Sequence, residues 1–108
     1  MNKREPGGEN FSPPYQYKIK FFTLFKLYFK RDFLVIESER APLKLFELIE
    51  KGSEILGKSL KEKLISKGKL KRGAIILIKG KNVLHLKELE TEIYPEDDIV
   101  FFPPGGGG

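Results

Sequence analysis

The end of the chain offers the clearest basis for chemistry, because it combines a carboxylate with an absence of side chains. Pro103 and Pro104 are followed by four glycines, Gly105 to Gly108. Prolines stiffen the backbone into an extended form, and glycine lets a chain pass through a narrow channel. Six residues span at most about 20 Å. This segment is therefore long enough to carry the carboxylate of Gly108 into another protein's active site.

Glycine-rich ends also occur as linkers or expression scars, so the four glycines alone carry little weight. The residues before the glycines make a functional role more plausible. Ile99–Phe102 is a short apolar run typical of a strand, and Pro103 would end that strand because proline cannot donate to the ladder. The glycines do not form a phosphate-binding loop, since no Lys-Ser/Thr and no helix follow them.

The side chains offer little for catalysis. The chain has no cysteine, which excludes disulfides, thiolate metal sites and a thiol that carries sulfur. Its single histidine, His85, has no nucleophile near it in the sequence, and we expect it on the surface. A zinc site would need mainly carboxylate ligands, which is unusual. The side chains thus point to no metal site and no catalytic constellation.

The formal net charge of +5 is unevenly distributed. From Lys58 to Lys81, nine residues are Lys or Arg and one, Glu62, is acidic, whereas every charged residue from Glu88 to Asp98 is acidic. A basic stretch is typical of nucleic-acid binding. A solvated surface rich in Lys and Glu gives the same pattern. Both interpretations stay open. A third is that the basic and the acidic stretch each bind a partner surface of opposite charge.

At 108 residues the chain has room for one domain with one modest core. Residues 1–14 have prolines and glycines but little apolar content, so we expect a flexible leader before a domain over 15–104 and a flexible tail over 105–108. No apolar run approaches the roughly 20 residues that span a bilayer, and the leader lacks the apolar stretch of a secretory signal. We therefore expect a cytoplasmic protein with no membrane partner.

The elements that must position this tail begin with a predicted hairpin. Residues of Tyr15–Thr23 alternate in polarity, which predicts a strand with one apolar face made by Tyr15, Tyr17, Ile19 and Phe21. Leu24–Arg31 is an apolar and basic connection with room for a short helical turn. Phe33–Glu37 then reads as the second strand.

Leucine spacing predicts the main helix. Pro42 is placed in its first turn, where a proline is tolerated, and the apolar positions at helical spacing are Leu45, Leu48, Ile49, Leu56, Leu60 and Leu64. Gly52 and Gly57 weaken its continuity. Ser53 is a candidate N-cap for a second stretch and Gly68 a candidate stop. We expect one main helix with an extra helical segment.

The second half of the chain predicts the remaining strands. Ala74–Ile78 is a continuous apolar run that predicts a strand buried on both faces. Lys79–Asn82 has turn chemistry, and Val83–Glu90 is either a short strand or a turn. After a turn over Pro95–Asp98 comes the last strand. The order predicts an α+β, β-grasp (ubiquitin-like) fold, in which a mixed sheet packs on one main helix and its first and last strands are parallel neighbours.

The second half also resembles a known family, the small subunit of molybdopterin synthase among the ubiquitin-like sulfur carriers. The family pattern is a strand ending in an Asn-Gly-type turn, a leucine–acid–threonine segment, an acidic turn, a Phe-Pro-Pro strand end, and Gly-Gly two residues later. The matching stretches are 75–83, 89–93 and 97–104, with Gly105 and Gly106 as spacers before Gly107 and Gly108.

The resemblance covers Tyr17 to Gly108 and is strong from Ala74 onward. Two departures concern turns. Lys79–Lys81 is Lys-Gly-Lys where the family usually has Asn-Gly-Arg, and Asp97 stands where glycine is common. In addition, residues 53–72 look longer and more basic than a minimal member needs. The tail is unaffected, but the choice of partner stays open.

What the resemblance implies is carrier chemistry on the tail. A ubiquitin-activating-type adenylyltransferase would use ATP to adenylate the Gly108 carboxylate, and a sulfur donor would convert it to a thiocarboxylate. The tail would enter the molybdopterin synthase large subunit, which transfers sulfur to the pterin for molybdenum (or tungsten) cofactor biosynthesis. This chain would be a co-substrate subunit, not an enzyme, and would bind no cofactor itself. The reacting end would be Gly107 and Gly108, and the partner contacts Phe101, Phe102, Pro103, Pro104, Gly105 and Gly106.

For Phe101 and Phe102 a core role competes with partner contact and is favoured, because buried aromatic rings mostly serve packing. Three other functions also stay open. The tail could modify protein lysines through isopeptide bonds, or supply sulfur for tRNA thiolation. Alternatively the domain could bind RNA through Lys58–Lys81, with Tyr15, Tyr17 or Phe21 as stacking platforms. RNA binding is disfavoured, because a core this small needs its apolar faces for itself.

Overall fold

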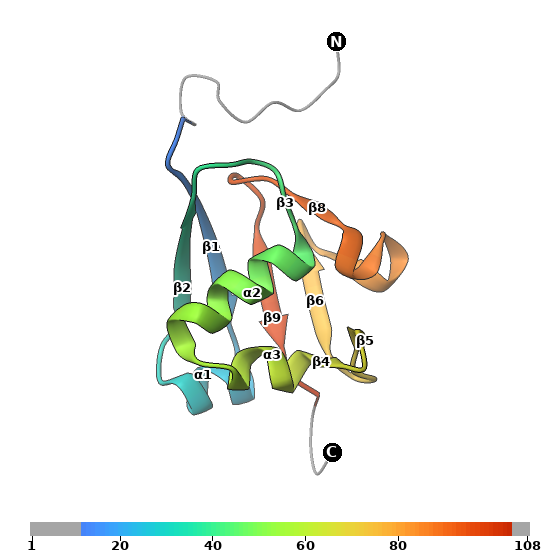
Figure 1. Cartoon of the computed structure of the whole chain (residues 1–108). Helices are drawn as coiled ribbons and strands as arrows, with labels where there is room; N and C mark the ends of the chain where they lie inside the picture. Colours follow the sequence, from blue (N-terminus) through green and yellow to red (C-terminus); the bar gives the residue numbers. More distant parts are fainter. Residues whose placement is uncertain (1–11, 105–108) are drawn as a thin grey trace.

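A five-stranded sheet with the order β2-β1-β9-β6-β7 forms the centre of the computed structural model, which describes residues 12–104 (Figure 1). Its strands are β1 Tyr15–Phe21, β2 Phe33–Ser38, β6 Ile75–Ile78, β7 Lys81–Asn82 and β9 Ile99–Phe102. β1 and β9 are parallel, and the other neighbours are antiparallel. The predicted β-grasp arrangement is confirmed. Of the predicted leader, residues 12–14 are described, and they are exposed.

The first strand ends earlier than predicted and a helix replaces its last residues. β1 stops at Phe21, and α1 (Thr23–Phe29) follows where a single helical turn was expected. Phe25 and Phe29 account for the change, because the ring of each lies 5.7 Å from that of Phe21, centroid to centroid. Coiling the segment brings both rings under the end of the sheet, which an extended strand could not do.

The main helix, α2 (Leu45–Leu56), crosses one face of the sheet and buries Leu45, Leu48, Ile49 and Gly52 (Figure 1). Its predicted apolar face is confirmed. The placement of Pro42 in its first turn is wrong. Leu43–Lys44 forms a short strand, β3, that pairs with β8 (Glu92–Ile93), so the backbone is still extended at Lys44 and the helix begins after it.

The predicted extra helical segment is α3 (Ser59–Leu64), which follows the helix break at Gly57. Two details of the prediction are wrong. Ser53 lies within α2 and is not an N-cap, although its hydroxyl accepts a hydrogen bond of 3.1 Å from the Lys61 backbone N–H in the first turn of α3. Gly68 does not stop the helix. It occupies the turn between β4 (Ile65–Ser66) and β5 (Lys69–Leu70), with φ of 78°.

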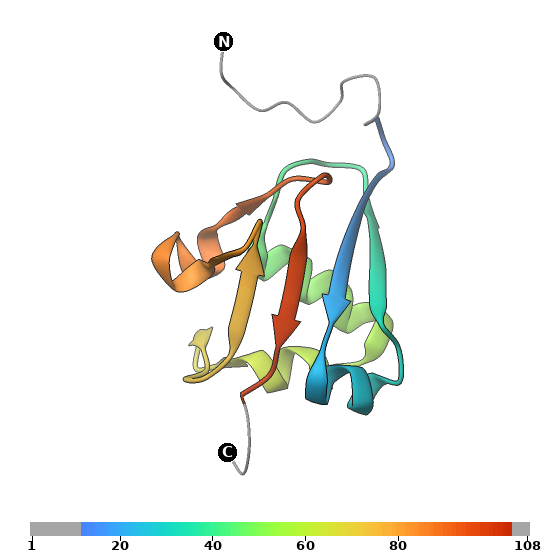
Figure 2. The same cartoon turned by 180° about the vertical axis from the view of Figure 1, so that it is seen from behind.

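The strand predicted to be buried on both faces is buried on one. In β6, Ile76 and Ile78 face the core, whereas Ile75 is 40% exposed and Leu77 is half-buried. The reason is visible from behind, where no helix covers this face of the sheet in the described part of the chain (Figure 2). The ambiguous segment after β7 forms two 3₁₀ turns, η1 (Val83–His85) and η2 (Glu88–Glu90).

Within residues 12–104, no helix has both the length and the apolar character needed to cross a bilayer.

Truncating Phe101 to alanine should lower the free energy of unfolding by about 3–5 kcal/mol, because a fully buried aromatic ring leaves a cavity in the core. Urea denaturation measures the change. The matched control is Phe33→Ala on β2, whose side chain is 45% exposed and should cost about 1 kcal/mol or less. Equal losses in the two variants would show that β9 does not hold the core together.

Glu47 should make stability depend on pH. Its carboxylate accepts hydrogen bonds from the Lys44 backbone N–H (2.9 Å) and the Arg40 guanidinium (2.7 Å), which hold the pKa of Glu47 below its ordinary value of 4.5. A lowered folded-state pKa stabilises the protein above pH 4.5, and this contribution disappears as pH falls through the folded-state value. Glu47→Ala should cost about 1 kcal/mol near neutrality, as the loss of a helix cap does.

The difference between wild type and Glu47→Ala, measured by urea denaturation at several pH values, should shrink below pH 4.5. Glu47→Gln keeps a neutral acceptor and serves as the control, since the stability of this variant should lack the pH-dependent component. A wild-type-to-alanine difference that does not shrink as the pH falls below 4.5 would contradict the account.

Candidate functional site at the end of the last strand

β9 is held on both sides, which fixes the point at which the chain leaves the sheet. Phe101 is paired with Phe21 of β1 in parallel and with Ile76 of β6 in antiparallel register. Phe102 is paired with Ile75. A central strand with ladders on both edges opens only when the domain does. The residues that follow Phe102 therefore leave from a rigid base, at the end of the sheet where α1 and α3 lie (Figure 1).

The two phenylalanines before the prolines point to opposite faces. Phe101 is fully buried, and its ring centroid lies 6.4 Å from that of Phe21, so its predicted contact with a partner gives way to a core role. Phe102 is half-buried on the outer face, where its ring meets Phe22 edge-on at 5.7 Å between centroids. Alternation along a strand explains the difference.

Phe102 belongs to an apolar area on the outer face of the sheet, which we call the outer patch. Its members are Phe22, Ile75, Leu77, Val100 and Phe102. Phe22 and Ile75 are 45% and 40% exposed, whereas Val100 is nearly covered by its neighbours. In register, Leu77 lies opposite Val100 and Ile75 opposite Phe102, so the patch is continuous across β6 and β9. Contiguous exposed apolar areas mark interaction sites.

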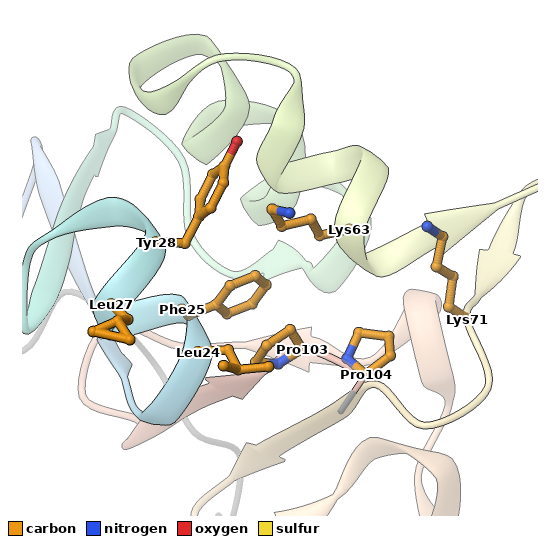
Figure 3. A pocket seen from close by; sticks show the side chains of 8 residues that line it. All are labelled: Leu24, Phe25, Leu27, Tyr28, Lys63, Lys71, Pro103 and Pro104. Atoms are coloured by element: carbon orange, nitrogen blue, oxygen red, sulfur yellow. The ribbon is translucent and has the colours of Figure 1, made fainter. Parts of the chain in front are cut away.

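Pro103 and Pro104 are half-buried and form one wall of a groove of about 480 Å³, which we call the exit groove. The opposite wall comes from α1 and α3, as the close view shows (Figure 3). The residues of the groove are Leu24, Phe25, Leu27 and Tyr28 of α1, Lys63 of α3, Lys71, and the two prolines. Sequence reasoning missed this groove, although it did identify the prolines.

Two lysines give the exit groove its charge. The Lys63 ammonium lies 4.0 Å from the centroid of the Tyr28 ring, a cation–π contact, and Lys71 lines the other end. Neither lysine forms an ion pair with a carboxylate in the described part of the chain. Nearby Lys61 differs, because it pairs with Glu50 of α2. The groove therefore combines an apolar floor with a cationic rim.

The acidic segment Glu88–Asp98 is partly neutralised within the fold. Lys20 pairs with Asp98 at 2.9 Å, and Lys44 pairs with Glu90 at 2.8 Å. Part of the acidic segment thus forms ion pairs within the domain. Such pairs are expected for a solvated surface rich in Lys and Glu, the second interpretation of the charge pattern. His85 is exposed in η1, which confirms its predicted surface position. Among residues 12–104 no group of three or more His, Cys, Asp or Glu could hold a metal ion.

The expectations for Gly105, Gly106, Gly107 and Gly108 lie outside the described residues. The described chain ends at Pro104, which we call the base of the tail and which lies beside the exit groove and near Phe102 of the outer patch. Gly73 packs against this base, since an added Cβ at Gly73 would lie 3.6 Å from the Cβ of Pro104.

The chain is similar in sequence to a protein named as a sulfur carrier and in structure to small modifier proteins. No family model matches the chain. A protein of Archaeoglobus fulgidus whose name describes it as a sulfur carrier is 33% identical over 73 residues, which make up 68% of this chain and 83% of that protein. The solution structure of small archaeal modifier protein 1 from Methanosarcina acetivorans superposes with a TM-score of 0.68 at 27% identity, over 87% of this chain and 97% of that one.

A third similarity concerns the fold alone. A Pyrococcus furiosus protein named as subunit 1 of a molybdopterin converting factor superposes with a TM-score of 0.64 at 23% identity. The match covers 84% of this chain and 99% of that one. These relatives are small carrier or modifier proteins, which agrees with the absence of a catalytic constellation expected from the sequence.

Replacing Gly73 by alanine should destabilise the protein by about 1–2 kcal/mol, the cost of a side chain in the left-handed region. Gly73 has φ of 90°, and the space beside Pro104 would admit a Cβ, so backbone strain and not a clash sets the cost. Thermal unfolding measures it. Gly73→Asn should recover part of the loss, because asparagine tolerates positive φ better. An alanine variant as stable as wild type would contradict this reasoning.

Proposed function

This chain belongs to the ubiquitin-like sulfur-carrier family, and from that premise we propose that it carries sulfur as a thiocarboxylate on Gly108. We further propose that the acceptor is the pterin precursor of the molybdenum (or tungsten) cofactor, with this chain as the small subunit of molybdopterin synthase. The observation that carries the proposal is the position of β9, a central strand paired on both edges that ends two residues before the glycines begin in the sequence.

A carboxylate needs activation before sulfur can replace one of its oxygens. In the proposed reaction, a carboxylate oxygen of Gly108 attacks the α-phosphorus of ATP and pyrophosphate leaves, which gives a mixed anhydride with AMP. A hydrosulfide equivalent from a sulfur donor then attacks the carbonyl carbon. AMP leaves with the original oxygen, and the thiocarboxylate remains. A ubiquitin-activating-type adenylyltransferase would supply the ATP site, so this chain needs only to present its end.

The outer patch supports such an encounter. In this proposal the catalytic pocket belongs to the partner, which must hold the body of this chain while the tail reaches into that pocket. Exposed apolar residues next to the base of the tail provide contact area for that purpose. We assign the outer patch as a docking surface for the adenylyltransferase and for the large subunit of molybdopterin synthase, which would use it in turn.

The molybdopterin assignment rests on the Phe-Pro-Pro strand end, a feature that the sequence shares with that family. The fold likeness to the Pyrococcus furiosus subunit is compatible with it. A second candidate, a modifier of protein lysines, is favoured by the 27% identity with the Methanosarcina acetivorans modifier protein. Both functions begin with the same adenylate, and they diverge in the nucleophile that attacks it.

The first test follows the mass of the intact chain. Incubation with the adenylyltransferase from the same genome, ATP and a sulfur donor should raise the mass by the difference between sulfur and oxygen. Removing Gly107 and Gly108 should lower the rate of loading at least about 100-fold, because even small misplacement of a reacting atom costs that much. The shortened chain still has a carboxylate, but it ends about 7 Å short of the reacting position.

An unchanged mass in the full-length chain would contradict the thiocarboxylate. Lysine conjugates recovered from the native host, and lost when the two glycines are removed, would instead support the modifier. Transfer of sulfur from the loaded chain to a pterin precursor in the presence of the large subunit would support molybdopterin synthesis.

A further inference from the structure

The exit groove has features that the sulfur chemistry does not require. Its apolar inner surface, the floor, comes from both walls: Leu24 and Leu27 of α1, the rings of Phe25 and Tyr28, and the two prolines. Leu27 is 71% exposed. Its rim holds Lys63 and Lys71, both of them half-buried and without a carboxylate partner among residues 12–104. Half-burial makes each cation costlier to leave unpaired than it would be in open solvent. These observations point to an acidic ligand.

We propose that the exit groove is the docking site for an acidic segment of the adenylyltransferase, which places an apolar side chain on the groove floor and carboxylates on Lys63 and Lys71. The proposal rests on the proposed function, because it assumes that such an enzyme receives the tail. Position supports it: Pro103 and Pro104 form a wall of the groove, so whatever sits there is next to the base of the tail. Adenylation of Gly108 is the first step of both candidate functions, so this enzyme is the partner that they share.

The glycines of this chain suit the groove poorly. Gly105–Gly108 could bring a carboxylate to a lysine, but they have no side chain to cover Leu24 and Leu27. Fixing glycine costs more backbone entropy than fixing any other residue, about 1–2 kcal/mol for each residue ordered. Without an apolar gain to offset this cost, the tail is a poor occupant of its own exit groove.

Nucleic acid also fits poorly. Single strands bind by stacking bases on exposed aromatic faces. Tyr28 is the exposed aromatic residue of the groove, and its ring is already engaged. The Lys63 ammonium lies 4.0 Å from its centroid, and the Phe29 ring makes a T-shaped contact with it at 4.8 Å between centroids. The other aromatic residue of the lining, Phe25, is fully buried, and the remaining apolar residues are leucine or proline. A second copy that docked groove to groove would bring the same cationic rim, and two such rims repel.

The test measures binding of the adenylyltransferase from the same genome to a chain that lacks Gly107 and Gly108, so that docking is separated from chemistry. The double variant Lys63→Glu/Lys71→Glu should raise the dissociation constant about 10-fold or more, because reversed charges face carboxylates. Leu27→Ser should weaken binding without affecting the fold, since Leu27 is mostly exposed. In the full-length chain, the groove double variant should raise KM for loading and leave kcat within a factor of about 2, as loss of uniform binding does.

The matched control is Lys79→Glu/Lys81→Glu, which makes the same change in net charge. These exposed lysines flank the turn after β6, at the opposite end of the sheet, where Ile78 is paired with Ile99 at the start of β9. The control should change the dissociation constant by less than about 3-fold, as mutation of distant surface charges does. Lys63→Gln/Lys71→Gln, with an intermediate effect, would show that charge and not misfolding is responsible.

The proposal is overturned if both double variants weaken binding equally, if neither does, or if the wild-type chain does not bind the enzyme at all. Self-association of the wild-type chain that only the groove variants abolish would assign the groove to a second copy. RNA binding lost in the same variants would assign it to nucleic acid. Binding that follows the prediction while Gly108 gains no sulfur would refute the proposed function and leave the groove assignment standing.

Discussion

The parallel pairing of β1 with β9 governs the rest of the structure. A strand from each end of the chain meets in the middle of one sheet, and β6 closes the other edge of β9. Backbone hydrogen bonds on both edges and the buried ring of Phe101 then fix the last strand. Because the strand cannot slide or fray alone, Pro103 and Pro104 leave the body at one place and in one direction. A small domain can thus fix the point at which the backbone leaves its sheet.

Because α2 covers only one face of the sheet, two different surfaces lie next to Pro103 and Pro104. α2 covers one face, and α1 and α3 cluster at the end where β9 stops, while the other face carries no helix among residues 12–104 (Figures 1 and 2). The same topology therefore leaves an apolar area on the outer face and a cationic groove below it. The two surfaces differ in chemistry, and they flank the same chain exit.

Local patterns predicted most of the fold, and long-range pairings account for the errors. The alternation in β1, the leucine spacing of α2 and the run that ends at Phe102 each show their structure within a few residues. The pairing of β3 with β8 joins two residues to two others almost fifty positions away, so nothing near Pro42 reveals it. In β6, an apolar run could not show whether its second face meets the protein's own core or a partner. The exit groove combines three distant segments, and only the prolines could be identified from the sequence.

In the proposed function, the carboxylate of Gly108 is the reacting group. Adding one alanine after Gly108 tests it most directly, because the body, both surfaces and every described residue stay as they are while the reacting carbon is moved outward by one residue. We expect this variant to bind the adenylyltransferase as tightly as wild type and to gain no sulfur in the intact-mass assay. Normal loading of the extended chain would contradict the account.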